Sequence, residues 1–382
     1  MKKILMVFGT RPEAIKMAPL YNEIKKNSDS LDLTLCVTAQ HREMLDQVLE
    51  SFKISPDIDL NIMKKGQDLF DVTSKILLKI RDVIENIRPD LILVHGDTST
   101  AFATSIAAFY SHTPIGHVEA GLRTRNIYSP FPEEFNRQII GKISKLHFTP
   151  TQISKNNLLN EFVDDFKIHI TGNTVIDSMF YMLNSIEKSK EKKDKITSIL
   201  NKHIKFKWLD KKYILITGHR RENFGQGFLN ICKSIKNLAT KHPDIYFVYP
   251  VHLNPNVKKP VNEILINKKN VILIPPLEYE PFLYLLKNCY LVLTDSGGIQ
   301  EEAPSLGKPV LVMRDETERP EAISAGTVKL VGSDEKTIVQ TVNELIESTE
   351  KYNEMATASN PFGDGTASLK ITAIIKEYFN VK

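Results

Sequence analysis

The sequence predicts an α/β protein with two doubly wound domains, and three observations lead to that prediction. Short apolar runs rich in β-branched residues alternate with amphipathic stretches along most of the chain. The alternation changes character around residues 185–212 and then restarts. The chain has 382 residues, enough for two domains of ordinary size. Alternating strands and helices of this kind favour parallel sheets covered by helices on both faces.

The first half contains one such series. Its expected strands are Lys3–Phe8, Leu31–Val37, Leu91–His95, Ile115–Glu119 and Lys145–Phe148. A turn at Gly9–Glu13 leads into a helix, and Pro12 suits the first helical position. Residues 72–87 repeat apolar side chains at helical spacing until Arg88-Pro89, which predicts a long amphipathic helix ending there.

A charged run at residues 187–195 separates the two series and is interpreted as a solvated helix face or connector. The strands expected after it are Tyr213–Thr217, Ile245–Tyr249, Val271–Ile274, Tyr290–Thr294, Val310–Met313 and Val328–Val331. A loop at residues 360–365 precedes a last helix from about Thr366 to Phe379. Two series of similar size predict two domains facing a cleft, with ligands at the carboxyl ends of the strands.

One stretch, Tyr290–Pro304, points to a ligand. A buried strand is expected to stop in the turn Asp295–Gly298 and restart as a helix at Ile299. Unpaired N–H groups and the helix dipole at such a point favour an anionic oxygen. Glu301 and Glu302 follow within one turn and suit the hydroxyls of a ribose, which suggests a nucleotide diphosphate. The alternative is an ordinary turn followed by a solvated glutamate pair.

The composition excludes several classes of protein. A net charge of +4 gives no reason to expect a nucleic-acid or membrane partner. There is no apolar run near eighteen residues and no signal-peptide pattern, so a cytoplasmic location is expected. Cys36, Cys232 and Cys289 lie singly in apolar surroundings without zinc-site spacing, and buried free thiols are expected.

Polar residues gather where the predicted strands end. In the first half these include Arg11, Lys16, His95, Asp97, His117, Glu119, Arg123, Glu133, Glu134 and Arg137, and in the second half His219, Arg220, Arg221, His252, Asp295, Ser296, Glu302, Arg314 and Arg319. Taken singly, His95 and His117 could be core histidines, and Arg220-Arg221 a solvated pair. Together they suggest diphosphate binding by cations and sugar chemistry by the acids of the first domain.

Other fingerprints are missing. Gly225-Gln226-Gly227 lacks the third glycine of a dinucleotide-binding motif, and no phosphate-binding loop with a Lys-Ser or Lys-Thr ending is present. Asp57-Ile58-Asp59 has the form of some metal-binding motifs, and His117-x-Glu119 could ligate zinc. The first opens a strand-like run and no partner ligand is suggested for the second, so no metal is expected.

Nine blocks of sequence together resemble the non-hydrolysing UDP-N-acetylglucosamine (UDP-GlcNAc) 2-epimerases. They are Phe8–Glu13, Thr38–Arg42, His95–Thr98, His117–Thr124, Pro130–Glu134, Thr217–Glu222, Tyr249–Pro255, Thr294–Pro309 and Glu318–Glu321. The resemblance runs from residue 3 past the loop at 360–365.

The resemblance implies two Rossmann-like domains in the arrangement of the glycosyltransferase B class. It gives an N-terminal domain of residues 1–170 plus about 365–382, and a UDP-binding domain of residues 171–364. It also implies a homodimer that interconverts UDP-GlcNAc and UDP-N-acetylmannosamine (UDP-ManNAc), a precursor of surface polysaccharides. The route is anti elimination of UDP to 2-acetamidoglucal and its re-addition, without cofactor or metal.

Residue roles follow from the same resemblance. Acid–base roles fall on Asp97, Glu119 and Glu133, with His219 at the diphosphate, and the substrate-binding positions are Arg11, Lys16, Phe282, Ser296, Gly298, Glu302 and Arg319. A second, activating UDP-GlcNAc site would use Gln40, Gln67, Arg220 and His252. Glu43 and Gly66 stand where activated relatives carry Gln and Arg, which argues against strong activation. Leu277 replaces a Gln seen near the uracil in some members.

Three other functions remain open. A glycosyltransferase of the same architecture would need an acceptor site and usually one catalytic acid. A non-catalytic UDP-sugar sensor would have no use for three carboxylates. A hydrolysing epimerase would release UDP and free N-acetylmannosamine.

Overall fold

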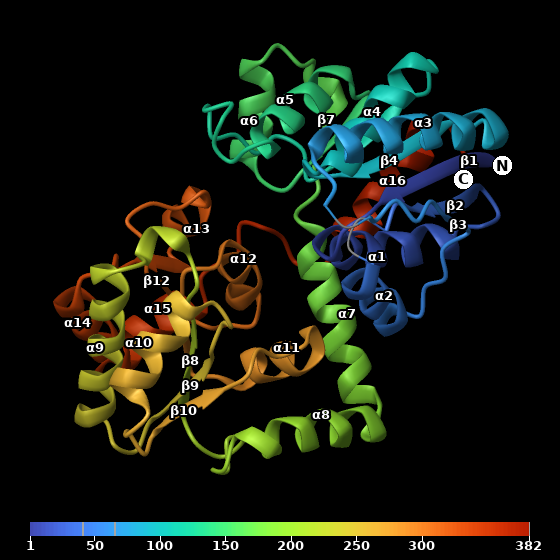
Figure 1. Cartoon of the computed structure of the whole chain (residues 1–382). Helices are drawn as coiled ribbons and strands as arrows, with labels where there is room; N and C mark the ends of the chain where they lie inside the picture. The colour runs from blue at the N-terminus through green and yellow to red at the C-terminus, as the bar shows by residue number, and fades with distance from the viewer. Residues whose placement is uncertain (40–41, 65, 382) are drawn as a thin grey trace. The chain divides into compact units, whose positions relative to one another are not determined.

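A computed structural model describes residues 1–39, 42–64 and 66–381 (Figure 1). The chain forms two compact units. Unit 1 comprises Met1–Phe180 with Phe362–Lys382, and unit 2 comprises Tyr181–Pro361. The sequence prediction places the domain boundaries at residues 170 and about 365, whereas the two units divide at Phe180 and Phe362. Both units are α/β, as the alternation of strands and helices predicts.

Unit 1 contains a seven-stranded parallel sheet in the order β3-β2-β1-β4-β5-β6-β7. Its strands are β1 (Lys2–Phe8), β2 (Leu31–Val37), β3 (Ile58–Asp59), β4 (Leu91–His95), β5 (Ile115–Val118), β6 (Leu146–Thr149) and β7 (Ile168–Ile170). Its helices are α1 (Arg11–Lys26), α2 (Arg42–Phe52), α3 (Leu69–Ile87), α4 (Ser99–Tyr110), α5 (Glu133–Ile143), α6 (Gln152–Asn160) and α16 (Ala367–Tyr378). The helix α7 (Thr174–Lys188) begins in unit 1 and continues into unit 2.

The C-terminal helix α16 belongs to unit 1, where it packs against α1 (Figure 1). Asp177 of α7 holds the start of α16, because its carboxylate accepts hydrogen bonds from the Ser368 N–H at 2.7 Å and the Ala367 N–H at 3.2 Å. A buried carboxylate at a helix N-terminus satisfies donors that the helix itself leaves unpaired. The last helix is therefore anchored to α7 and packs against α1.

Unit 2 contains a six-stranded parallel sheet in the order β10-β9-β8-β11-β12-β13. Its strands are β8 (Tyr213–Thr217), β9 (Tyr246–Pro250), β10 (Val271–Ile274), β11 (Leu291–Thr294), β12 (Val310–Val312) and β13 (Val328–Leu330). Its helices are α8 (Lys190–His203), α9 (Gln226–Lys241), α10 (Pro255–Leu265), α11 (Tyr279–Asn288), α12 (Gly297–Ser305), α13 (Pro320–Ser324), α14 (Glu335–Glu347) and α15 (Thr349–Ala356).

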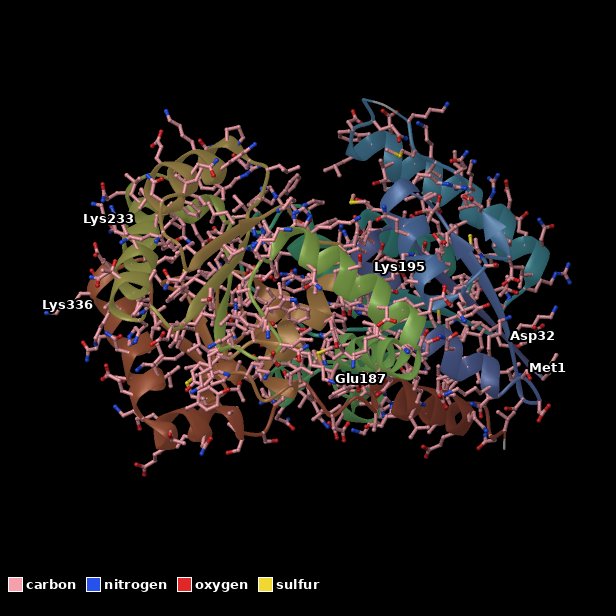
Figure 2. The ribbon with its side chains drawn as sticks, turned by 90° about the horizontal axis from the view of Figure 1, so that it is seen from below. Met1, Asp32, Glu187, Lys195, Lys233 and Lys336 are labelled. Carbon is pink, nitrogen blue, oxygen red and sulfur yellow. The ribbon has the colours of Figure 1, made fainter. Side chains whose placement is uncertain are left out.

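The charged run at 187–195 joins α7 to α8, and most of its side chains are exposed, as expected for a solvated helix face. Glu187 and Lys195 of this run are marked in Figure 2. Ser189 begins α8 by accepting a hydrogen bond from the Lys192 N–H. The run is therefore a helical connector.

The two sheets share one topological property that places the functional residues. In each sheet the strand order reverses at the centre, between β1 and β4 in unit 1 and between β8 and β11 in unit 2. Helices leave the two central strands toward opposite faces at such a point, which opens a crevice at the carboxyl ends of the strands. The loops that begin at Gly9, Gly96, Gly218 and Asp295 follow these four strands.

Several expected boundaries differ from the observed ones by a residue or two, and two of these differences bear on the candidate site. The helix expected from Ile299 begins at Gly297, so Gly297 and Gly298 form its first turn. The strand expected to include Glu119 ends at Val118, and Glu119 has a left-handed φ of 62°. That backbone conformation is costly for a residue with a side chain. It turns Glu119 out of the sheet at the carboxyl end of β5.

Candidate functional site

The carboxyl edge of the unit 1 sheet brings a buried carboxylate together with three donors. Glu119 Oε2 contacts Lys16 Nζ from α1, His95 Nε2 from the end of β4 at 3.2 Å, and Asn173 Nδ2 at 3.1 Å. The Glu119 side chain is 8% exposed. These partners lie far from Glu119 in the sequence and meet there because of the sheet order.

The partners decide the charge of Glu119. Burial raises the pKa of a carboxyl group, because it disfavours the ionised form. The charge of Lys16 and the contact with His95 outweigh burial and hold the pKa of Glu119 well below its usual value. Glu119 is therefore a carboxylate at neutral pH, and its position suits a proton acceptor.

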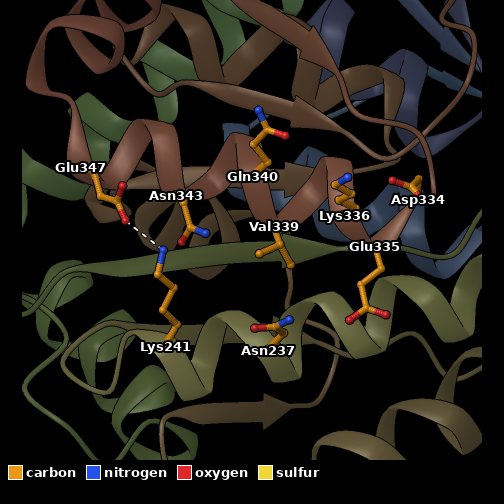
Figure 3. A pocket seen from close by; sticks show the side chains of 9 residues that line it. All are labelled: Asn237, Lys241, Asp334, Glu335, Lys336, Val339, Gln340, Asn343 and Glu347. Atoms are coloured by element: carbon orange, nitrogen blue, oxygen red, sulfur yellow. Dashed lines mark hydrogen bonds and ion pairs between the residues drawn. The ribbon is translucent and has the colours of Figure 1, made fainter.

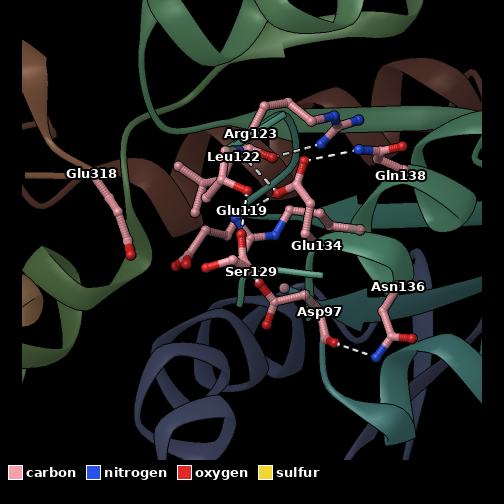
Figure 4. Close-up of polar contacts among 12 residues, drawn as sticks. Asp97, Glu119, Leu122, Arg123, Ser129, Glu134, Asn136, Gln138 and Glu318 are labelled. Carbon is pink, nitrogen blue, oxygen red and sulfur yellow. Dashed lines mark hydrogen bonds and ion pairs between the residues drawn. The ribbon is translucent and has the colours of Figure 1, made fainter. Parts of the chain in front are cut away.

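The pKa of Asp97, two residues after β4, shifts in the opposite direction and is raised. Its carboxylate pairs with Arg137 at 2.6 Å, and Asn136 fixes its backbone by donating to the Asp97 carbonyl oxygen at 2.8 Å (Figure 4). Burial raises the pKa of Asp97, Arg137 opposes that effect, and the negative charges of Glu119 and Glu133 add to the rise. Two neighbouring carboxyl groups whose pKa values shift in opposite directions are typical of an acid–base pair.

The adjacent acids Glu133 and Glu134 have different roles. Glu134 is fully buried and accepts hydrogen bonds from the backbone N–H groups of Thr124 at 3.0 Å and Arg125 at 3.2 Å. It therefore holds the loop before α5. Glu133 is half-buried and acts electrostatically on Asp97, so it is the member of the pair that belongs to the site.

The first turn of α1 is held by a buried glutamate. Glu13 accepts hydrogen bonds from the Gly9 N–H at 3.0 Å, the Thr10 N–H at 2.8 Å and the Thr98 hydroxyl at 2.7 Å. It therefore joins the loops after β1 and β4 at the centre of the sheet. Arg11 is the first residue of α1 and is half-buried.

His117 lies in the core. Its Nε2 donates to the Gly96 carbonyl oxygen at 2.7 Å, and burial lowers its pKa to about 3. The ring is thus neutral and supports the loop that carries Asp97. The interpretation of His117 as a core histidine holds, whereas His95 contacts the carboxylate of Glu119.

In unit 2 a second buried carboxylate holds the loop after β8. Asp295 is fully buried, and its Oδ2 accepts hydrogen bonds from the backbone N–H groups of His219 at 2.7 Å and Arg220 at 2.8 Å. The His219 ring stacks on His252 with a centroid distance of 5.2 Å. Burial lowers the pKa of His219, while Asp295 raises it.

The N-terminus of α12 lies among cationic groups. The Cβ of a side chain at Gly297 would lie 3.9 Å from the Arg319 guanidinium and 4.0 Å from that of Arg220. Arg319 also pairs with Glu301 of α12 and with Glu318. Unpaired helix N–H groups and two guanidinium groups together form an anion-binding arrangement.

The remaining unit 2 candidates lie on α11 and α12 or directly before α12. Ser296 precedes α12, and Gly298 is exposed in its first turn. Glu302 is 7% exposed and contacts the Tyr279 hydroxyl of α11 at 3.4 Å. Phe282 is half-buried on α11.

The residues of the expected activating site are only partly described. Gln40 lies outside the described residues. Gln67, in unit 1, accepts a hydrogen bond from the Lys64 N–H. Arg220 and His252 lie beside His219 and α12 in unit 2.

Several features lie apart from these residues. A groove between α9 and α14 is lined by charged side chains, among them Lys241 and Glu347 paired at 3.0 Å, and contains no predicted site residue (Figure 3). Asp57 accepts a hydrogen bond from the Leu35 N–H, and Asp59 pairs with Arg42, so both acids have partners within the fold. Among residues 1–39, 42–64 and 66–381, no cluster of three or more His, Cys, Asp or Glu side chains could hold a metal ion. No helix in these ranges has the length and hydrophobicity needed to cross a membrane.

Comparison with known proteins decides the family. The model of the UDP-N-acetylglucosamine 2-epimerase family matches residues 22–376. The chain belongs to this family. It is 56% identical over 374 residues to the UDP-N-acetylglucosamine 2-epimerase of Campylobacter jejuni, covering 98% of this chain and 97% of that protein. It is equally similar to the enzyme of Escherichia coli K12, with 56% identity over 374 residues, 98% of each chain.

Solved structures of the family have the same fold. The UDP-GlcNAc 2-epimerase of Neisseria meningitidis, crystallised with UDP-GlcNAc, superimposes with a TM-score of 0.87 at 52% identity, covering 98% of this chain and all of that one. A putative 2-epimerase from Listeria monocytogenes gives a TM-score of 0.91 at 45% identity, over 100% and 97% of the two chains. The resemblance to the non-hydrolysing epimerases is thereby confirmed, as is the predicted pair of Rossmann-like domains. The chain is accordingly an enzyme of the isomerase class, a UDP-GlcNAc 2-epimerase.

Sequence reasoning did not single out Asn173 or Glu13. Asn173 follows β7, a three-residue strand containing a polar histidine, which gave no recognisable apolar run. Glu13 lies in one of the family's blocks, but only the structure shows that its carboxylate faces inward. The signal that could have found Glu13 is the Thr10-x-x-Glu13 spacing of a capping box.

The role of Asp295 can be tested by hydrogen exchange. Asp295→Asn removes the charge that strengthens the two hydrogen bonds to the His219 and Arg220 N–H groups. Charge-assisted bonds are about twice as strong as neutral ones, so these amides should exchange about tenfold faster. The matched control is Asp334→Asn, which alters a carboxylate that accepts from the Thr337 N–H at 2.8 Å. Unchanged exchange at residues 219 and 220 in Asp295→Asn would show that the turn does not depend on this carboxylate.

Proposed function

We propose that this chain interconverts UDP-GlcNAc and UDP-ManNAc by anti elimination of UDP and its re-addition. The observation that carries the proposal is the pair Asp97 and Glu119, whose pKa values shift in opposite directions at one edge of the unit 1 sheet. Inverting a carbon requires a proton to leave one face and return to the other. Two carboxyl groups, one with a lowered and one with a raised pKa, can perform these two transfers.

The chemistry follows from the sugar. The hydrogen at C2 is not next to a carbonyl group, so direct deprotonation is unfavourable. If the C1–O bond to UDP breaks first, positive charge builds on C1 and acidifies the C2 hydrogen. Loss of that proton gives 2-acetamidoglucal and UDP. Protonation of C2 from the opposite face and re-formation of the C1–O bond give the epimer.

The unit 1 residues divide these tasks. Glu119 is ionised, so it can take the C2 proton in one direction. Burial raises the pKa of Asp97, and the charges of Glu119 and Glu133 add to the rise, which favours Asp97 as the acid that supplies a proton to the other face. In the reverse direction the two roles exchange. Lys16 keeps Glu119 ionised, and Arg11 and Lys16 are proposed to contact the substrate.

The unit 2 residues suit departing UDP. Arg220, Arg319 and the N-terminus of α12 provide cations and N–H groups for the diphosphate, and His219 lies in the loop that Asp295 holds. Ser296 and Gly298 provide the start of α12, Glu302 is proposed to bind the ribose, and Phe282 to line the site. Stabilising the leaving diphosphate accelerates the elimination. The Neisseria meningitidis relative, crystallised with UDP-GlcNAc, supports this choice of ligand.

Two further proposals concern a regulatory site and the use of the product. Gln40, Gln67, Arg220 and His252 are proposed to bind a second UDP-GlcNAc, with weak activation because Glu43 and Gly66 replace the Gln and Arg of activated relatives. The enzyme is proposed to act in the cytoplasm. Its product is proposed to supply N-acetylmannosamine for surface polysaccharide.

Deuterium incorporation tests the reaction. The protein is incubated with UDP-GlcNAc in heavy water without an acceptor, and the products are followed by NMR. We expect UDP-ManNAc, with deuterium at C2 of both sugars, because every turnover exchanges that proton with solvent. Free N-acetylmannosamine would instead indicate the hydrolysing reaction, and unchanged substrate would contradict the epimerase.

Two variants complete this experiment. Asp97→Asn and Glu119→Gln remove one proton-transfer group each and should lower turnover about 10²–10⁴-fold. UDP should still bind to both, since neither Asp97 nor Glu119 is among its proposed contacts. Wild-type rates in both variants would remove the assigned acids from the mechanism.

A homodimer is also proposed. The family resemblance implies it, and exposed apolar side chains on the adjacent helices α3 and α4 are consistent with a surface for a second copy. Phe70 is 85% and Phe109 54% exposed.

Light scattering should give about twice 43.4 kDa for the wild type and 43.4 kDa for the double variant Phe70→Glu with Phe109→Glu. The control is Phe166→Glu, at a 74% exposed position outside these helices, which should remain dimeric. A monomeric wild type would contradict the homodimer. A dimeric double variant would contradict the placement of its surface on α3 and α4.

A further inference from the structure

Asn173 occupies a special point of unit 1. It lies three residues after β7 and directly before α7, the helix along which the chain leaves unit 1 at Phe180. The chain returns to the unit at Phe362. Asn173 is 3% exposed, so the polar atoms of its side chain need partners.

The two ends of its carboxamide have separate partners. Oδ1 accepts a hydrogen bond from the Val175 N–H at 3.2 Å, which supports the first turn of α7. Nδ2 donates to Glu119 Oε2 at 3.1 Å, the oxygen that Lys16 and His95 also contact. One side chain thus joins the start of α7 to the carboxylate of Glu119.

The backbone of Asn173 contacts the returning segment. Its N–H donates to the Phe362 carbonyl oxygen at 2.7 Å. Next to it, Gly172 and Gly363 pack backbone against backbone, because a Cβ on either would lie 3.2 Å from the Cα of the other. Both glycines have positive φ, 87° and 113°, which side chains disfavour. The outgoing and returning segments therefore lie in direct contact here.

The residue type matches these contacts. For the turn of α7 alone, Asp or Ser would serve at least as well as Asn. An Asp, however, would place a second carboxylate against Glu119 Oε2, and a Ser is too short to make both contacts. Only a carboxamide offers an acceptor to Val175 and a donor to Glu119.

We propose that Asn173 is a positioning residue for Glu119, and that it couples the orientation and ionisation of this carboxylate to the contact between the outgoing and returning segments. The inference rests on the proposed acid–base role of Glu119. Displacement of the Phe362 segment would move Asn173, and the donor on Glu119 Oε2 would move with it.

Asn173→Asp is the sharpest test, because it keeps the acceptor for Val175 and changes only the group that faces Glu119. A lost donor and an added negative charge both raise the pKa of Glu119. The acidic limb of the pH profile of kcat should therefore move up by more than one pH unit, while KM stays within about threefold. Asn173→Ala, which loses only the donor on that side, should move the limb by about one unit.

Asn157→Ala is the matched control. Its Nδ2 donates to the Gly121 carbonyl oxygen at 3.0 Å, so it is another loop-fixing amide of unit 1 that does not contact Glu119. It should leave the position of the acidic limb unchanged. A structural loss common to both asparagines would lower kcat at every pH without moving the limb.

The coupling itself is tested at Gly363. Gly363→Ala strains a φ of 113° and pushes against Gly172, so it should move the acidic limb in the same direction as Asn173→Ala. Gly326→Ala is the control, since Gly326 has a φ of 77° but no atom within 4 Å of its added Cβ. An acidic limb that stays at the wild-type pH in Gly363→Ala would overturn the coupling.

The outcomes separate this inference from the proposed function. A wild-type protein that forms no UDP-ManNAc would refute the function itself. An active wild type whose pH profile is superimposable on that of Asn173→Asp would overturn the role of Asn173 alone. Where a variant turns over too slowly for a profile, ¹³C NMR titration of the Glu119 carboxyl group gives the same shift directly.

Discussion

The ion pair between Lys16 and Glu119 is the interaction on which the unit 1 site depends. A carboxylate that is 8% exposed is costly unless cations and donors compensate its charge. Lys16 supplies the cation from α1, His95 a ring nitrogen from β4, and Asn173 an amide from the start of α7. Three separate elements thus meet at this carboxylate, and the contacts with Lys16 and His95 hold its pKa low. The fold is thus a condition for its chemistry, and its negative charge adds to the rise that burial causes in the pKa of Asp97.

The chain uses buried carboxylates in two ways. Glu13, Glu134 and Asp295 accept backbone N–H groups and hold the loops that follow strands. Glu119 and Asp97 instead pair with the side chains of Lys16 and Arg137. A carboxylate occupied by backbone donors has a fixed partner and a structural role. One that pairs with side-chain cations can take or release a proton without breaking the backbone hydrogen bonds that hold a loop. The same residue type therefore serves as scaffold or as reactive group according to its donors.

Much of this arrangement could be predicted from the sequence. Apolar runs located most strands, because buried parallel strands have continuous hydrophobic patterns. Polar residues at the ends of those runs gave Asp97, Glu119, His219 and Arg319. The pairing of Lys16 with Glu119 could not be found from spacing, since 103 residues separate them. Asn173 follows β7, which is too short to give a recognisable apolar run. Gly297-Gly298 is typical of a turn by its local pattern but forms the first turn of α12. The local pattern does not distinguish the two.

The ionisation of Glu119 is the central claim, and ¹³C NMR of protein labelled at glutamate carboxyl carbons measures it directly. The Glu119 resonance is identified by its absence in Glu119→Gln, and its chemical shift is followed as the pH is lowered. We expect a carboxyl group that titrates well below the usual glutamate value, and that titrates higher in Lys16→Met. A Glu119 resonance that titrates at or above the usual value in the wild type would show that Lys16 and His95 do not keep this carboxyl group ionised.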